Sequence, residues 1–155
     1  MHIVMDRLNT LSLNCHGYNM ATALYLNRIC SNFDVILLQE TWLSSVNCNK
    51  LDNINDFVSV HTSAMEEKLV SNMFTGLPFG GTAILLRKSL GACSYRIVTN
   101  NPRVTAVRCQ MKCREDLVIC SVYMPSNDYS FQYSVVFEET IGCLQGVIDQ
   151  CLGCK

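Results

Sequence analysis

The sequence is poor in charged residues and in proline, and it has no long hydrophobic run. Charged side chains make up 16% of its 155 residues, against about 25% in average globular proteins. Only three residues are proline, and 49% are hydrophobic. This composition excludes a disordered chain, because such chains lack the apolar surface that a core needs. The length has room for one core, so residues 1–155 are expected to form a single domain.

An excess of charge of either sign is also lacking. Twelve Lys and Arg residues against thirteen Asp and Glu residues give a net charge of −1. No global positive field therefore attracts nucleic acid, although a local basic patch is compatible with this balance. Two interpretations stay open for the cationic residues near predicted strands, a basic face or ordinary solvated charges; these residues are Arg87, Lys88, Arg103, Arg108, Lys112 and Arg114.

Neither a secretion signal nor a membrane span is recognisable. Asp6 and Arg7 interrupt the apolar start of the chain. The apolar runs at Val35–Leu38 and Ala83–Leu86 are far shorter than the roughly 20 residues that cross a bilayer. We therefore expect an intracellular protein, nuclear or cytoplasmic, that is not secreted and makes no membrane contact.

The ten cysteines are expected to be reduced, because nothing indicates an oxidising compartment. A zinc site is an alternative, since Cys151 and Cys154 form a CxxC pair and Cys109 and Cys113 form a looser one. Cys151 also fits the apolar stripe of a helix. That simpler role is favoured over a metal site.

Hydrophobic patterning predicts about six strands and two substantial helices, a mixed α/β or α+β domain. The strands are expected at Leu11–Leu13, Val35–Leu38, Phe57–His61, Thr82–Leu86, Val104–Cys109 and Leu117–Tyr123. Asn19 is placed to cap a helix that runs to about Cys30. A second helix starts at Asp128 or Ser130 and ends at Gly153. Its apolar residues at spacings of four and three predict the face that meets the core: Phe137, Ile141, Leu144, Ile148 and Cys151.

Polar side chains follow two of the predicted strands. Asn14 comes directly after the first, and Glu40 ends the segment Val35–Glu40. Because strand ends form ligand crevices in α/β sheets, an amide and a carboxylate can meet at one rim if these strands are neighbours. Such a pair of oxygen-bearing groups suits Mg²⁺. The alternative is that both residues simply begin surface loops.

A tyrosine and two histidines add further candidates. Tyr123 lies at another strand end, where its hydroxyl can donate to a phosphate or can simply face water. His16 and His61 are candidate bases or metal ligands, or structural histidines, because no partner triad is visible for either.

Four segments, in this order, resemble the endonuclease/exonuclease/phosphatase superfamily. They are Leu13–Gly17, Asp34–Trp42, Gly80–Leu85 and Val122–Asn127. The resemblance is closest to the apurinic-type endonuclease domains of non-LTR (LINE-type) retrotransposons, and the Gln-Glu-Thr-Trp sequence at residues 39–42 carries it most specifically.

The resemblance implies a two-sheet α/β sandwich with outer helices and a metal-assisted attack of water on a phosphodiester. Glu40 matches the metal-binding glutamate of the family, Asn14 the asparagine beside it, and Tyr123 the tyrosine that contacts the scissile phosphate. Mg²⁺ or Mn²⁺ is the implied cofactor and DNA the implied partner, with Tyr123 and His16 as candidate nucleic-acid contacts. His16 departs from the Asp or Asn that related sequences more often carry at this turn.

The later family motifs are missing: a Gly-Asp-Phe-Asn block, a further acidic residue and a terminal aspartate–histidine pair. Residues 1–155 therefore resemble the amino-terminal half of such a domain, and we expect this truncated form to be inactive or nearly so. A non-catalytic remnant or binding module is the alternative. Half a sandwich is also expected to leave one apolar sheet face open, and this face would favour self-association or chaperone binding.

Overall fold

The computed structural model describes residues 7–63, 69–70, 73–74, 80–111, 115–127 and 130–153. Its helices are α1 (Met20–Ile29), α2 (Lys88–Gly91), α3 (Phe131–Leu152) and two 3₁₀ helices, η1 (Cys30–Asn32) and η2 (Cys48–Asn53). Its strands are β1 (Thr10–Asn14), β2 (Val35–Gln39), β3 (Phe57–Thr62), β4 (Leu69–Val70), β5 (Met73–Phe74), β6 (Thr82–Arg87), β7 (Ser94–Ile97), β8 (Val104–Cys109) and β9 (Leu117–Val122).

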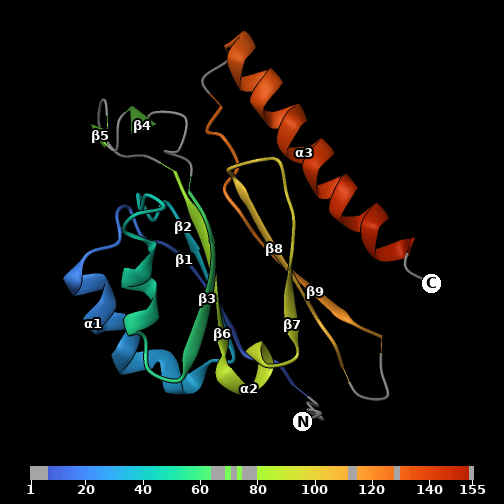
Figure 1. Ribbon diagram of the computed structural model, residues 1–155. Coiled ribbons are helices and arrows are strands. Elements are labelled where there is room, and N and C mark those ends of the chain that lie inside the picture. The colour runs from blue at the N-terminus through green and yellow to red at the C-terminus, as the bar shows by residue number, and fades with distance from the viewer. Residues whose placement is uncertain are drawn as a thin grey trace.

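Two larger sheets lie between two helical layers (Figure 1), and β4 and β5 form a separate two-stranded sheet. The first sheet has the order β1-β2-β6-β3, with β1 parallel to β2 and β6 antiparallel to both of its neighbours. The second sheet, β7-β8-β9, is antiparallel throughout. Helix α1 and the 3₁₀ helices cover the outer face of the first sheet, and α3 lies across the second sheet. The expected mixed α/β, two-sheet architecture is confirmed.

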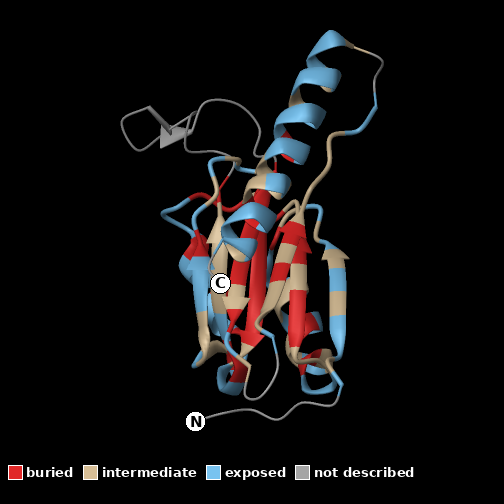
Figure 2. Ribbon diagram, turned by 90° about the vertical axis from the view of Figure 1, so that its right-hand side faces the viewer, coloured by how far each residue is buried: buried red, intermediate tan, exposed pale blue. Residues whose placement is uncertain are grey.

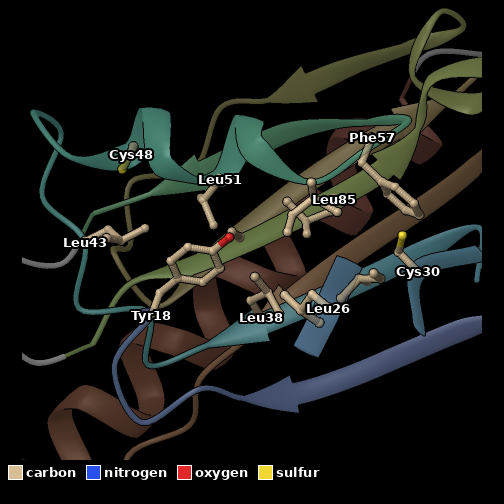
Figure 3. Packing of buried hydrophobic residues seen from close by; sticks show 12 residues of the cluster. Tyr18, Leu26, Cys30, Leu38, Leu43, Cys48, Leu51, Phe57 and Leu85 are labelled. Atoms are coloured by element: carbon tan, nitrogen blue, oxygen red, sulfur yellow. The ribbon is translucent and has the colours of Figure 1, made fainter. Parts of the chain in front are cut away.

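Both faces of the central strands β2 and β6 are buried, which explains the unbroken apolar run at the start of β2. Ile36 and Leu38 pack toward α1 and η2, in the cluster drawn in Figure 3. Val35, on the opposite face, packs with Val107 and Ile119 of the second sheet. The strands at the centre of the molecule are accordingly the most deeply buried part of it (Figure 2).

The expectation of an open apolar sheet face is wrong for the residues that the structure describes. Val35 and Ile36 point to opposite sides of β2, and each is fully buried. The outer face of the second sheet is also covered, because Ala106 contacts Val147 of α3 and Cys120 packs against the same cluster. The first sheet is covered on its inner face by the second sheet, which consists of β7, β8 and β9. The 22-residue helix α3 covers the other face of that second sheet.

The two main helices begin as the sequence predicts, but one of them turns a different face inward. Asn19 caps α1 by accepting from Thr22 N, and Ser130 caps α3 by accepting from Tyr133 N. Asp128, the alternative start, lies outside the described residues. On α3, Thr140 and Val147 are the buried residues. Of the five predicted core positions, Cys151 packs with Val147 and Leu144 is half-buried, whereas Phe137, Ile141 and Ile148 are 37%, 45% and 51% exposed.

The physical reason is that α3 carries apolar residues on more than one face. Thr140 can turn inward because its hydroxyl donates to Val136 O within the helix at 2.7 Å, so no polar group is left unpaired. Periodicity identified an apolar stripe but not which side of it meets the sheet. Phe137, Ile141, Ile148 and Leu152 form a partly exposed strip, which we call the outer stripe of α3.

The cysteines that the structure describes do not support the zinc alternative. Cys109 packs between the two sheets, whereas Cys151 packs on the α3 side of the second sheet. Cys113 and Cys154, which would complete the two cysteine pairs, lie outside the described residues. The eight described cysteines are present as thiols. Within the described ranges, no helix is both long and apolar enough to cross a bilayer.

Candidate functional site

Three chain segments are joined by backbone hydrogen bonds at the edge of the sheet where β1 and β2 end. The parallel pairing of the two strands brings Asn14 opposite Gln39. Beyond the strands, Gly17 N donates to Glu40 O at 2.8 Å and Trp42 N donates to Gly80 O at 2.9 Å. The ends of β1 and β2 and the start of β6 are therefore held side by side as a rim.

The backbone of this rim is strained. Four described non-glycine residues have a positive φ, and three of them lie here: His16 at 47°, Glu40 at 50° and Trp42 at 55°. Such left-handed conformations cost about 1–3 kcal/mol each and cluster at functional sites. Gly17 is needed at φ 96°, because a Cβ atom there would lie 2.6 Å from Trp42 Cε3. These three residues therefore hold backbone conformations that lower the stability of the folded protein.

Three side chains converge on the Glu40 carboxylate. Asn14 Nδ2 donates to Oε1 at 3.0 Å, and His16 Nδ1 lies 3.2 Å from Oε2. The hydroxyl of Tyr123, just after β9, is the third group that interacts with this carboxylate. The Asn14 side chain is itself held, because its Oδ1 accepts from His16 N at 3.0 Å. The structure thus brings together Asn14, His16, Glu40 and Tyr123, all four of the candidates that the resemblance implies.

These contacts shift the pKa values of both Glu40 and Tyr123. Hydrogen bonds from Asn14 and Tyr123 hold the pKa of Glu40 below its ordinary value, because they stabilise the carboxylate. The same bond raises the pKa of Tyr123, whose hydroxyl must stay protonated in order to donate. Glu40 is therefore an anion at neutral pH. Its side chain is 15% exposed, whereas that of His16 is 82% exposed.

A buried hydroxyl network fixes the second sheet against this rim. Gln39 Nε2 donates to Ser121 Oγ at 3.1 Å, and Ser121 Oγ donates to Leu38 O at 3.0 Å. Thr82 and Thr105 are linked through their hydroxyls at 2.8 Å. Because buried polar groups pair only in a defined register, these bonds set where β9 ends and hence where Tyr123 lies.

Sequence reasoning missed Gln39, Ser121 and the position of Arg103. Ser121 is a polar residue within an apolar strand, and that pattern was the available signal for a buried contact. Arg103 was one of several residues in a candidate basic face, with nothing to single it out. In the structure its guanidinium carbon lies 5.0 Å from the centre of the Tyr123 ring. His61 pairs with Ala83 across β3 and β6 and is not among the side chains that bond Glu40.

The rim fits a cation that takes few protein ligands. Across the part of the chain that the structure describes, no group of three His, Cys, Asp or Glu residues is arranged to hold a metal. Mg²⁺ is commonly held by one or two carboxylates, with waters and substrate phosphate oxygens as its other ligands. A single ionised, oriented carboxylate at an accessible rim matches that mode, and it does not match a closed zinc site.

The fold is similar to that of two solved nucleic-acid enzymes, over about half of their length. One similar structure is a variant of the 3′ phosphatase NExo from Neisseria bound to a product DNA hairpin, with a TM-score of 0.61 and 14% identity over 96% of this chain and 54% of that one. Another is the AP endonuclease LMAP from Leishmania major, with a TM-score of 0.55 and 13% identity over 76% of this chain and 40% of that one. The chain therefore spans about half the length of these proteins. No protein-family model matches it, and no curated protein matches its sequence.

Proposed function

We propose that the rim around Glu40 is the cation and phosphate site of a metal-dependent phosphodiesterase that acts on DNA, of the retrotransposon endonuclease type. The observation that carries this proposal is the convergence of Asn14, His16 and Tyr123 on one ionised carboxylate. The structural likeness to a DNA-bound phosphatase and to an AP endonuclease supports it.

Each residue has a distinct role in this proposal. Glu40 would hold Mg²⁺ or Mn²⁺, and the cation would supply neutralisation of charge on phosphoryl oxygens and a lowered pKa for a water. Asn14 keeps the carboxylate oriented and adds an amide oxygen to the site. Tyr123 moves its hydrogen bond from Glu40 to an oxygen of the scissile phosphate. His16, which is exposed on the Trp42 ring at a centroid distance of 4.9 Å, contacts the nucleic acid.

The 155-residue chain is expected to bind the cation without measurable turnover. Its rim offers one carboxylate in contact with Asn14 and Tyr123, and the described residues gather no group of three His, Cys, Asp or Glu side chains that could hold a metal. Water activation and leaving-group stabilisation need additional positioned groups. Binding and catalysis are therefore separable in this chain.

Manganese binding measured by electron paramagnetic resonance tests the cation site. Glu40→Gln should lower Mn²⁺ affinity at least tenfold, because the variant keeps the shape of the side chain and removes its charge. Glu139→Gln, at an exposed carboxylate on α3, is the matched control and should leave the affinity unchanged. Equal affinities in all three proteins would overturn the proposal. A plasmid-nicking assay with Mg²⁺ tests turnover, and nicking that Glu40→Gln abolishes would contradict only the expected inactivity.

Protein association is a second candidate function, favoured by the outer stripe of α3. Phe137, Ile141, Ile148 and Leu152 are 37–61% exposed apolar residues on one helix, and such strips mark interaction surfaces. Sedimentation velocity should show oligomers that Ile141→Lys dissociates and Glu40→Gln does not. A monomer at all concentrations would remove this candidate.

A further inference from the structure

A small polar cavity lies directly beside the proposed cation site. It has a volume of about 200 Å³ and opens between the start of β8, the loop after β9 and the first turns of α3. Arg103, Tyr123, Ser126, Gln132 and Tyr133 supply its polar groups. Tyr123 lies between the two sites, because its hydroxyl interacts with Glu40 and the same residue lines the cavity.

The charge of the cavity suits an anion. Its described lining contains one cation, Arg103, and no carboxylate. The other polar groups are hydroxyls and the amide of Gln132, all of which can donate hydrogen bonds. Its volume is below the range of about 300–1,000 Å³ that is typical of pockets for drug-sized ligands. The space therefore suits a phosphate group rather than a whole nucleotide.

Arg103 is fixed in place to present its guanidinium. The group lies over the Tyr123 ring, and Nη1 donates to Tyr123 O at 3.3 Å. The backbone of Arg103 is anchored as well, since its N donates to Asn101 Oδ1 and its O accepts from Tyr123 N at 2.9 Å. A guanidinium has five N–H donors, more than these contacts use, and its planar fork matches a phosphate.

We propose that this cavity is a second phosphate subsite, which holds the phosphate of a nucleic acid strand next to the one bound at Glu40. The inference rests on the proposed function for the identity of the strand. Arg103 is the cationic wall of the subsite and positions the strand, while Tyr123 separates the two phosphates. Binding in the cavity needs no divalent cation, because its charge is supplied by the protein.

Titration with thymidine 3′,5′-bisphosphate in EDTA tests the subsite, followed by two-dimensional NMR of the full chain. The amides of Ser126 and Gln132 should shift, and Arg103→Gln should weaken binding about tenfold, the size expected for a charge-assisted hydrogen bond. Because Arg103 also contacts Tyr123, a second variant leaves both residues intact. Gln132→Glu puts a negative charge into the cavity at a helix start, where it favours folding, and should also weaken binding about tenfold.

Ser134→Glu is the matched control, since this exposed residue lies on the same helix and does not line the cavity. It should bind the bisphosphate like the wild-type protein. Absence of binding, or binding that neither Arg103→Gln nor Gln132→Glu weakens, would overturn the inference. Because the titration contains no free divalent cation, a failure of Mn²⁺ binding at Glu40 would be seen separately and would not change this result.

Discussion

Two polar clusters lie at opposite ends of the first sheet, and they differ in what their side chains contact. At one end, Arg87 ends β6 and Asp34 precedes β2. Arg87 Nε lies 3.4 Å from Asp34 Oδ1, and its Nη2 donates to the backbone oxygens of Cys30, Ser31 and Phe33. At the other end, the carboxylate of Glu40 is bonded by side chains alone.

The difference separates a structural cluster from a candidate site. Arg87 satisfies carbonyl groups at the end of a helix, which closes the connection between α1 and β2. The Glu40 rim instead keeps His16, Glu40 and Trp42 in left-handed backbone conformations, with His16 exposed. Strain and exposure together are the reason we propose the Glu40 end, and not the Arg87 end, as the functional end of the sheet.

The largest expected effect is on stability at the Arg87 end. Arg87→Ala leaves three carbonyl oxygens and Asp34 without their cation, so the free energy of unfolding should fall by about 2–4 kcal/mol. Urea denaturation measures it. Arg96→Ala, at an arginine that bonds only Thr62 Oγ1 among its described contacts, should change it by less than about 0.5 kcal/mol. If Arg87→Ala also weakened Mn²⁺ binding, the two ends would not be independent.

A smaller loss is expected at the rim, combined with a loss of binding. Gly17→Ala places a Cβ atom against the Trp42 ring at φ 96°, so it should cost about 1–2 kcal/mol of stability. Because Gly17 N bonds Glu40 O, Mn²⁺ affinity should fall as well. Gly142→Ala, at a glycine whose added Cβ meets nothing within 4 Å, is the control and should slightly stabilise the helix. Unchanged Mn²⁺ affinity in Gly17→Ala would show that the backbone at Gly17 does not position the cation site.

Relief of strain should act in the opposite direction. His16→Gly removes a side chain at φ 47°, and we expect it to raise stability by about 0.5–1 kcal/mol. The same change deletes the proposed nucleic-acid contact, so DNA affinity in a filter-binding assay should fall. A variant that is both less stable and equally able to bind DNA would show that His16 is structural.

The smallest effect is a dependence on pH. The pKa of Glu40 is lowered in the folded protein, so its contribution to stability is present above the ordinary value of 4.5 and is lost as the pH falls through the lowered value. The stability lost between about pH 7 and about pH 3 should therefore be smaller in Glu40→Gln than in the wild-type protein. Denaturant midpoints at the two pH values measure the difference. Equal acid losses would mean that the hydrogen bonds to Glu40 do not favour its charged form.

Much of this molecule could be predicted from local pattern. All six expected strands form, with ends close to those predicted, because apolar runs and alternation reflect burial directly. The short strand β7 was not predicted, since Ser94–Ile97 has only one buried residue. The positions of Asn14 and Glu40 followed from the parallel pairing of β1 with β2, and the assigned roles of these residues stay predictions.

What the sequence determined by itself is which residues of the strands leave water and where each strand ends. It did not determine which surface covers them, because hydrophobic burial is not directional and one apolar stripe can meet several neighbours. Only the tertiary structure decided that both faces of β2 are covered, that Thr140 rather than Ile141 faces the second sheet, and that Arg103 lies against Tyr123. Such contacts join residues that are distant along the chain, and their geometry depends on how the two sheets and α3 pack together.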